Sequence, residues 1–396
     1  AVTNANAAGF HLREQSPAAQ GNAFAGATAG AENNSYAYFN VAGLTRQKGT
    51  QVNVGGTYII PRAEAHDIVD ENGVRNQDVN NIVHAAIAPN ATISHQLNDD
   101  VTLGLAMNVP FGMITKYDGE WVGSDHGITS KVTTVTTTPM IAYKATDKLS
   151  IGAGLPIQYI KARLSNSVVG TPYDATLEGD TLDVGYQLGA MYEFNEDTRL
   201  GINYRSEINH KLKGDISSNA PSMLSFLNQD ITARLDTPAM LSIGGYHRIN
   251  DKWEVMAEYQ RVFWSSFDRL DITASNGSFI NTTYENWRDT NFYALGASYK
   301  VDNQWTARFG LAYDEAAVKL ADRTPRIPDS NRIWYSFGLG YQYTENLTFD
   351  MSFTYIDAKD AVVNTAGTQN SGTLPNVYAE YSNSVKMWGL SLNYKF

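Results

Sequence analysis

The chain lacks cysteine and long apolar runs, and it carries few charges. There is no cysteine among its 396 residues, so no Cys–His cluster suggests zinc. No run of 18 apolar residues occurs, which excludes a membrane-spanning helix. Only 18% of the residues are charged, and the net charge of −11 argues against nucleic acid as a partner. No segment reads as a long amphipathic helix, and no glycine-rich turn precedes a helix as a phosphate site would require.

Alternating apolar and polar residues fill most of the chain after residue 47. In one segment Leu182, Val184 and Tyr186 alternate with Asp183 and Gly185. A period of two residues predicts β-strands with one apolar and one polar face. The chain is rich in aromatic residues, with 23 Tyr, 15 Phe and 7 Trp, and many of them fall near the ends of these runs. Aromatic residues at strand ends are typical of membrane interfaces.

Six short polar turns separate these runs at nearly even intervals. Between neighbouring turns lie a strand, a longer connection and another strand, so the repeating unit is a β-hairpin. The short turns all fall on one side of the hairpins. This asymmetry is typical of a transmembrane β-barrel with short periplasmic turns and long extracellular loops. The turns lie at residues 98–100, 146–148, 195–197, 250–252, 302–303 and 344–346.

The pattern predicts an all-β fold, a 14-stranded antiparallel transmembrane β-barrel with an N-terminal hatch in its lumen. An even number of strands places both ends of the barrel on the periplasmic side. The alternative is a large soluble β-sandwich, but the strands are too many and too uniform for its mixed connections. The expected strands cover residues 48–65, 80–97, 100–116, 128–146, 148–165, 176–195, 198–214, 230–249, 252–270, 287–301, 304–319, 331–344, 347–362 and 381–396.

Residues 1–46 show no strand pattern and are rich in alanine, glycine and asparagine. We expect them to form the hatch, followed by the barrel at residues 47–396. A segment that starts on the periplasmic side is most easily ordered inside the barrel, and fourteen strands leave room for a plug. The alternative is a flexible periplasmic tail. The chain begins at Ala1 as a processed protein would, so we expect that a signal peptide has been removed.

The long connection at residues 215–229 contains apolar residues that fit one face of a short helix. An exposed apolar helix at the mouth of a barrel could capture a hydrophobic ligand. The alternative, that these residues pack against neighbouring loops, is at least as well supported. The candidate capture residues are Met223, Leu224, Phe226 and Leu227.

Short distinctive motifs lie along the whole chain. Those within residues 1–46 are Gly9-Phe10-His11, Gly21-Asn22-Ala23 and Asn40-Val41-Ala42-Gly43, and later ones are Pro110-Phe111-Gly112, Trp305-Thr306-Ala307-Arg308 and Ile327-Pro328-Asp329. This ordered set is highly specific and resembles the FadL family of outer-membrane transporters. The first group is similar to the hatch of the family, and Pro110-Phe111-Gly112 is similar to its kinked third strand.

Two departures from the family pattern bear on function. The family hatch usually carries Asn-Pro-Ala where this chain has Asn40, Val41 and Ala42. Valine frees one backbone φ angle and restores an N–H group, so we expect a different hatch geometry there. The connection at residues 166–175 is also short, and an outer ligand groove formed by a longer loop in the family is therefore not implied here.

The resemblance implies passive uptake of hydrophobic molecules, above all long-chain fatty acids, across the bacterial outer membrane. It also implies lateral release into the membrane through a gap at the kinked third strand. The sequence supplies a cause for this gate at Pro110, Phe111 and Gly112, because proline lacks a ladder donor and glycine weakens pairing. Pro89 and Pro139 also remove donors, so proline alone is not specific. The alternatives are a channel for aromatic hydrocarbons and a general diffusion porin with a structural plug.

Lys161, Arg163 and Arg205 are candidate ligands for a carboxylate headgroup, because a cation near an apolar pocket can hold such a group. Ion-pair networks inside the barrel are the more common role for lumenal charges. Lys161 and Arg163 share the parity of the lipid-facing Leu155, so they point inward only if Pro156 switches the two faces.

No catalytic motif is present, because the seven histidines form no recognisable arrangement with serine and aspartate. We therefore expect no enzyme, no cofactor and no metal. The expected partners are a hydrophobic small molecule, outer-membrane lipid and the barrel-assembly machinery, which would recognise the last strand ending in Phe396. We expect a monomer.

Overall fold

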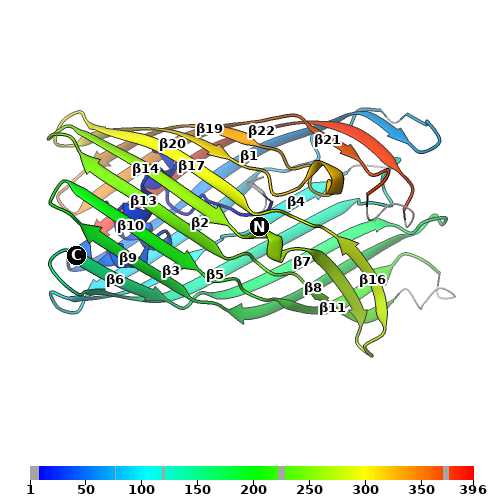
Figure 1. Ribbon diagram of the computed structural model, residues 1–396, viewed down its shortest axis with the longest axis horizontal. Helices are drawn as coiled ribbons and strands as arrows, with labels where there is room; N and C mark the ends of the chain where they lie inside the picture. The colour runs from blue at the N-terminus through cyan, green and yellow to red at the C-terminus, as the bar shows by residue number, and fades with distance from the viewer. Residues whose placement is uncertain (1–8, 76, 118–120, 222–227, 369–373) are drawn as a thin grey trace.

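The structure is a closed antiparallel β-barrel of fourteen wall strands (Figure 1). It is a computed structural model that describes residues 9–396 except 76, 118–120, 222–227 and 369–373. The last strand pairs with the first over nearly its whole length, which closes the sheet. The prediction of a 14-stranded barrel is therefore confirmed.

Several wall strands are interrupted, so the described part of the sheet comprises 22 strand segments. The 3-10 turns η5 (Trp264–Ser266) and η6 (Leu320–Asp322) lie in connections. In chain order the segments are β1 (Thr50–Asp70), β2 (Ala86–Gln96), β3 (Val101–Asn108) with β4 (Gly112–Lys116), β5 (Thr129–Lys144), β6 (Leu149–Gly154) with β7 (Ile157–Ser167), β8 (Asp174–Val184) with β9 (Gln187–Glu193), β10 (Thr198–Arg205) with β11 (Lys211–Ser218), β12 (Gln229–Arg234) with β13 (Met240–Arg248), β14 (Trp253–Val262) with β15 (Arg269–Ala274), β16 (Phe279–Tyr284) with β17 (Thr290–Lys300), β18 (Trp305–Asp314), β19 (Arg332–Gln342), β20 (Leu347–Ala358) with β21 (Ala361–Asn364), and β22 (Val377–Lys395).

Polar side chains hold the short turns together. The Oδ1 atom of Asn98 accepts hydrogen bonds from the N–H groups of Asp100 and Val101, at 3.0 and 2.9 Å. Asn250 and Asp302 make the same kind of contact in their own turns. Such side chains mimic a backbone turn, which explains why these residue types mark the hairpins in the sequence. The short turns lie at one end of the barrel and the long connections at the other (Figure 1).

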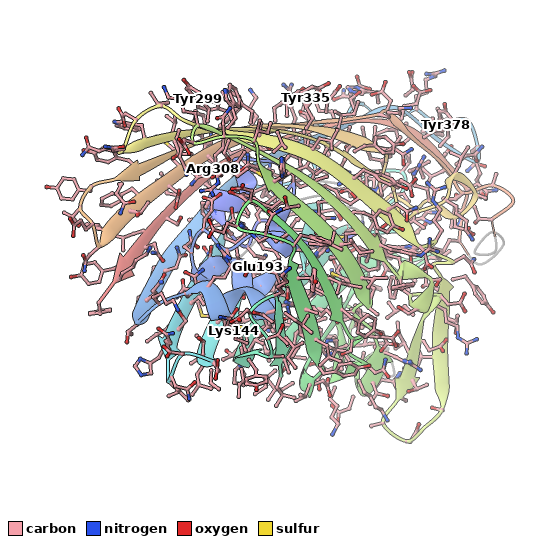
Figure 2. The ribbon with its side chains drawn as sticks, turned by 60° about the vertical axis from the view of Figure 1, so that its left-hand side comes forward. Lys144, Glu193, Tyr299, Arg308, Tyr335 and Tyr378 are labelled. Carbon is pink, nitrogen blue, oxygen red and sulfur yellow. The ribbon has the colours of Figure 1, made fainter. Side chains whose placement is uncertain are left out.

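Apolar side chains cover the outer face of the wall. Leu182, Leu188 and Leu295 expose 62%, 52% and 69% of their surface. Tyr299 and Tyr335 also lie on the outside of the barrel (Figure 2). So large an apolar surface fits contact with lipid rather than with water.

Residues 9–46, called here the N-terminal segment, lie inside the barrel near the short turns (Figure 1). The segment contains α1 (Pro17–Gln20) and the 3-10 turns η1 (Ala27–Ala29), η2 (Asn34–Tyr38) and η3 (Val41–Arg46). Glycine on the inner wall lets it approach closely, because a Cβ atom at Gly310 would lie 2.1 Å from the backbone of Asn22. No helix in the described part of the chain is long and apolar enough to cross a membrane.

Buried polar contacts fix the N-terminal segment to the wall. Arg308 of β18 forms ion pairs with Glu32 of the segment at 2.7 Å and with Asp350 of β20 at 2.9 Å. Figure 2 shows Arg308 on the inner side of the wall, beside the segment. The carboxylate of Glu258 accepts hydrogen bonds from the hydroxyl and the N–H group of Thr28, the latter at 3.1 Å.

Two hairpins differ from expectation at the end of the barrel that carries the long connections. Residues 271–286 are not a long loop, because β15 and β16 continue as a hairpin that extends beyond the barrel (Figure 1). Strand β2 begins later than expected. Ile82 and Val83, which precede it, pack instead into an apolar cluster with Tyr117 and Tyr381.

Candidate functional site

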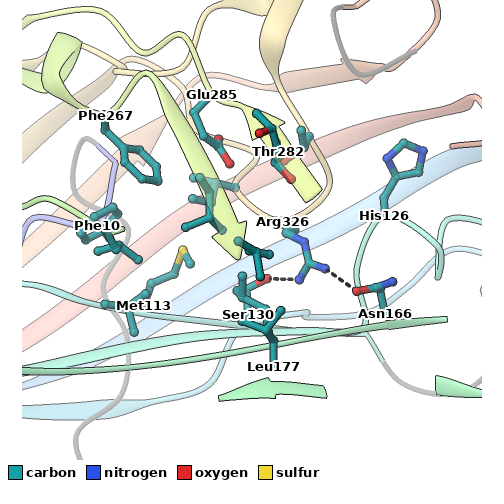
Figure 3. A pocket seen from close by; sticks show the side chains of 18 of the residues that line it. Phe10, Met113, His126, Ser130, Asn166, Leu177, Phe267, Thr282, Glu285 and Arg326 are labelled. Atoms are coloured by element: carbon teal, nitrogen blue, oxygen red, sulfur yellow. Dashed lines mark hydrogen bonds between the residues drawn. The ribbon is translucent and has the colours of Figure 1, made fainter. Parts of the chain in front are cut away.

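An apolar cavity of about 220 Å³ lies in the lumen between the N-terminal segment and the long connections (Figure 3). Strands β5, β7 and β8 supply one wall, and the hairpin of β15 and β16 supplies the opposite one. The apolar lining residues include Met113, Val132, Leu164, Leu177, Phe267 and Leu270.

Phe10 of the N-terminal segment forms part of the cavity lining and is itself surrounded by aromatic rings. Its ring centroid lies 4.8 Å from that of Trp264, 5.7 Å from that of Trp287 and 5.8 Å from that of Phe111. These contacts are edge-to-face or tilted, which aromatic rings prefer. The cavity is therefore in direct contact with the segment that fills the lumen below it.

Arg326 brings a positive charge to the cavity. Its Nη1 atom donates hydrogen bonds to Ser130 Oγ at 2.9 Å and to the carbonyl oxygen of Thr129 at 3.1 Å, and Nη2 contacts Asn166 at 3.4 Å (Figure 3). All three acceptors are uncharged, and within the described residues Arg326 forms no salt bridge. Burial lowers the pKa of Arg326 to about 10, so the guanidinium stays charged at neutral pH.

The backbone around Arg326 is held from β4 and the segment after it. The hydroxyl of Tyr117 donates to the carbonyl oxygen of Pro325 at 2.7 Å and lies 2.7 Å from the hydroxyl of Tyr381. Thr115 Oγ1 donates to the carbonyl oxygen of Arg326 itself, at 2.9 Å. These contacts fix the direction in which the guanidinium points.

Glu285 is a second ionisable residue in the cavity lining. Its Oε2 atom accepts a hydrogen bond from Trp287 Nε1 at 3.1 Å. Burial raises the pKa of Glu285 to about 7, and the charge of Arg326 opposes this rise. Near neutral pH the cavity therefore holds either a neutral or an ionised carboxyl group.

The cavity is bounded on the side away from the short turns by two connections that meet at His126. Its Nε2 atom lies 2.6 Å from the carbonyl oxygen of Pro375, which joins the connection after β4 to the one before β22. Burial lowers the pKa of His126 below its usual value. The imidazole is therefore neutral at pH 7 and donates this hydrogen bond.

The third wall strand is interrupted at Val109, Pro110 and Phe111, between β3 and β4. The N-terminal segment pairs with this interruption. The N–H group of Leu12 donates to the carbonyl oxygen of Pro110 at 2.7 Å, and the N–H group of Gly112 donates to that of Phe10 at 2.9 Å. His11 and Phe111 thus face each other in a short antiparallel bridge.

Beside this interruption, the neighbouring strand β2 pairs with the third wall strand over only part of its described length. It pairs with β3 only from Ala91 to Gln96 within the described residues, although β2 starts at Ala86. The side chain of Asn90 donates to the carbonyl oxygen of Gln15 at 2.9 Å. The N-terminal segment therefore occupies the position where a continuous third strand would have paired with β2.

Lys161 and Arg163 do not line the cavity. They stay on the outward face that Leu155 shares, and both pair there with Glu178, at 2.5 and 3.5 Å. The wall is interrupted at Leu155–Pro156, but the two faces are not exchanged there. Orientation thus removes these two residues from the headgroup candidates.

Arg205 is buried against the N-terminal segment rather than against the cavity. Its guanidinium carbon lies 4.1 Å from the ring centroid of Tyr38, and Nη2 donates to the carbonyl oxygen of Tyr38 at 3.0 Å. Arg205 therefore anchors the segment that fills the lumen.

The hatch motif around Val41 adopts an ordered turn without the usual proline. The Oδ1 atom of Asn40 accepts from the N–H group of Ala42 at 3.0 Å, and its Nδ2 atom donates to the carbonyl oxygen of Ala190 at 2.9 Å. Val41 is fully buried, and Gly43 lies close to the carbonyl oxygen of Gly30. The capping asparagine supplies the start of η3, a role in which proline is not required.

The remaining sequence candidates fall outside the described residues. This applies to Met223, Leu224, Phe226 and Leu227, the expected capture residues. Among the residues that are described, no three histidine, aspartate or glutamate side chains gather as a metal site would need.

Sequence reasoning missed Arg326 and Glu285. Both lie in connections, where strand parity predicts no direction for a side chain. Arg326 immediately precedes the Ile327-Pro328-Asp329 motif, so the motif marked the right segment. What could not be inferred is that this connection folds inward over the lumen.

Comparisons with known proteins agree with this architecture. The family model for "Outer membrane protein transport protein (OMPP1/FadL/TodX)" matches residues 1–396. A long-chain fatty acid transport protein of Escherichia coli is 27% identical, covering 100% of this chain and 96% of its own. The crystal structure of a Pseudomonas aeruginosa FadL homologue superposes with a TM-score of 0.91 at 25% identity, covering 98% of this chain and 100% of its own.

The toluene transporter TbuX of Ralstonia pickettii shares the fold, with a TM-score of 0.74 at 20% identity and coverage of 97% of this chain and 99% of its own. The match of the family model over the full length is decisive. The chain belongs to the OMPP1/FadL/TodX family of outer-membrane transport proteins, which are channels for hydrophobic compounds and not enzymes.

Proposed function

We propose that the protein takes up long-chain fatty acids by binding the carboxylate at Arg326 and the acyl chain in the apolar cavity. The observation that carries this proposal is a partly buried guanidinium whose hydrogen-bond acceptors within the described residues are all uncharged. A buried cation is costly unless it is paired, and a ligand carboxylate would complete its coordination. An aromatic hydrocarbon makes no use of this charge.

The apolar lining suits the acyl chain. Burial of a methylene group contributes about 0.8 kcal/mol, so a tail of about fifteen methylenes avoids water by on the order of 12 kcal/mol. The acyl chain can therefore leave the cavity at a useful rate only toward another apolar phase. The lipid around the barrel wall is the nearest such phase.

We also propose that the ligand leaves laterally, beside the interruption at Val109–Phe111. Three features support this route: the part of β2 that is not paired with β3 within the described residues, the pairing of the N-terminal segment with Pro110 and Gly112, and the position of Phe10 in the cavity lining. Displacement of residues 10–12 would open a path from the cavity to the wall. In this scheme residues 1–46 act as the hatch.

An aromatic hydrocarbon is the second candidate ligand. TbuX, which shares the fold, is a toluene transporter. The cavity of about 220 Å³ exceeds the roughly 150 Å³ that suffices for benzene. The size of the cavity therefore admits a single aromatic ring, whereas the charge of Arg326 favours the fatty acid.

A general diffusion porin is the less favoured reading, because the N-terminal segment fills the lumen with buried residues. Conductance in a planar bilayer distinguishes the two. We expect a small conductance, whereas a large and stable aqueous conductance would favour the porin.

The test of the headgroup role is an Arg326→Gln variant of the full chain. Loss of a charged hydrogen-bond donor is worth about 1.5–3 kcal/mol, so we expect affinity for hexadecanoate to fall roughly 10- to 150-fold. Affinity for toluene and for hexadecanol should hardly change. Lys161→Gln is the matched control, because Lys161 faces outward. Equal affinity of Arg326→Gln and the wild type for hexadecanoate would contradict the proposal.

Assembly is a separate matter. We propose that the barrel-assembly machinery recognises the last strand through Phe396, which is 73% exposed at the end of β22. We further propose that the protein works as a monomer in outer-membrane lipid. Deletion of Phe396 should slow insertion without altering ligand affinity of the folded protein.

A further inference from the structure

A narrow apolar slot opens beside the cavity. The slot measures about 20 Å³ and has an almost wholly apolar lining. Leu164, Leu177, Leu235 and Leu270 line both the slot and the larger cavity, so the two are adjacent. The other side of the slot is the barrel wall itself, at β7, β8, β11 and β12.

The register of these strands explains the slot. Ala162 of β7 lies opposite Gly179 of β8, and Gly179 lies opposite Gly214 of β11. One row across three neighbouring strands therefore has almost no side chains. In the adjoining row, Leu212 of β11 lies opposite Ala233 of β12. Small residues in one row of a sheet leave a trough that runs across the strands.

The width of the slot limits what can enter. A volume near 20 Å³ is little more than a single water-sized group, whereas benzene occupies a cavity of roughly 150 Å³. A methyl or methylene group fits, and an aromatic ring does not. The lining offers no polar side chain to a ligand.

We propose that this slot receives the methyl end of an unbranched acyl chain, so that Ala162, Gly179 and Ala233 set the preferred chain length. The inference rests on the proposed function and makes it more specific, because it selects straight chains over rings. Each methylene seated in the slot should improve affinity about fourfold.

Ala233→Leu tests the proposal by filling the slot, and Ala162→Leu is the second variant from the opposite side. We expect the ratio of the affinities for hexadecanoate and decanoate to fall about fourfold in both. Toluene affinity should stay constant, since a ring does not use the slot. The reverse change, Leu212→Ala, should deepen the slot and favour octadecanoate over hexadecanoate by about fourfold.

Ala257→Leu is the matched control, because Ala257 is exposed on the outer face of β14. Folding is checked by the heat-dependent mobility of the barrel in gels, and relative affinities are compared at one detergent concentration. An unchanged chain-length ratio in folded Ala233→Leu and Ala162→Leu would overturn the slot while leaving the proposed function intact. If the wild type binds no carboxylate of any length, the proposed function itself fails.

Discussion

The two halves of the lumen are built differently. In the half near the short turns, the N-terminal segment is fixed by buried ion pairs and hydrogen bonds, such as those of Arg308 and Glu258. In the half near the long connections, aromatic and aliphatic side chains surround a cavity with one arginine. Polar contacts in the first half specify one geometry, whereas the apolar contacts in the second are non-directional.

The boundary between the halves is the bridge between His11 and Phe111. It joins the most N-terminal described part of the segment to the interrupted third strand, and Phe10 beside it lines the cavity. We propose that residues 9–12, which face the apolar half, are the part that shifts during transport, while residues 20–46 stay anchored to the wall.

The largest predicted effect concerns the polar half. Arg308→Ala leaves Glu32 and Asp350 without their partner, and loss of one member of a buried ion pair costs about 3–5 kcal/mol. We expect the N-terminal segment to loosen, seen as higher conductance in a planar bilayer, while affinity for hexadecanoate stays constant. Arg248→Ala removes a half-exposed pair with Asp197 and should change neither quantity. A loss of ligand affinity in Arg308→Ala would show that the halves are not independent.

A smaller effect concerns pH in the apolar half. Because the pKa of Glu285 is raised to about 7, this carboxyl is neutral below pH 7 and ionised above it. Ionised Glu285 competes for Arg326 and repels an anion, so affinity for an anionic ligand should fall as pH rises. Dodecyl sulfonate is a suitable probe, because its own charge does not titrate in this range. Its affinity should fall by up to about tenfold between pH 6 and pH 8.

Glu285→Gln removes this titration, so the affinity of the variant for dodecyl sulfonate should not change with pH over the same range. The other ionisable groups near the site are His126, Asp125 and Asp322. Burial lowers the pKa of His126, which is therefore already neutral at pH 7. A pH profile in Glu285→Gln identical to that of the wild type would assign the effect to one of them.

The smallest effect concerns the support of Arg326. Tyr117→Phe removes the hydrogen bond to Pro325, which is worth about 1 kcal/mol, so we expect about a fivefold loss of hexadecanoate affinity. Tyr381→Phe keeps that hydrogen bond, so its loss of hexadecanoate affinity should be smaller. Equal losses in the two variants would mean that the tyrosine pair acts as a unit rather than through Pro325.

The sequence predicted the barrel well because its signals are local. Alternation sets the face of each residue, and turn residues such as Asn98 bond to their own backbone neighbours. The same alternation kept Lys161 and Arg163 on the outward face, where they are found. Motifs alone marked the interruption at Pro110 and the segment that pairs with it.

The cavity could not be predicted because it depends on distant contacts. Arg326 meets Ser130 and Asn166, which are far from it in sequence and on different strands. The slot likewise arises from strand register, which brings Gly179 and Gly214 together. Neither glycine is distinctive in the sequence, since the chain contains 32 of them.

The central claim is that the ligand passes where the N-terminal segment pairs with the interrupted third strand. His11 and Phe111 form a non-hydrogen-bonded pair, in which Cα atoms lie about 4.5 Å apart, within the range of a disulfide. The chain has no other cysteine, so His11→Cys with Phe111→Cys forms one defined crosslink.

Hexadecanoate uptake by cells carrying this double variant, measured before and after reduction, tests the claim most directly. The reduced protein and the two single variants are the controls. The account predicts that uptake stops in the oxidised protein and returns on reduction. Equal uptake in the oxidised and reduced states would contradict it.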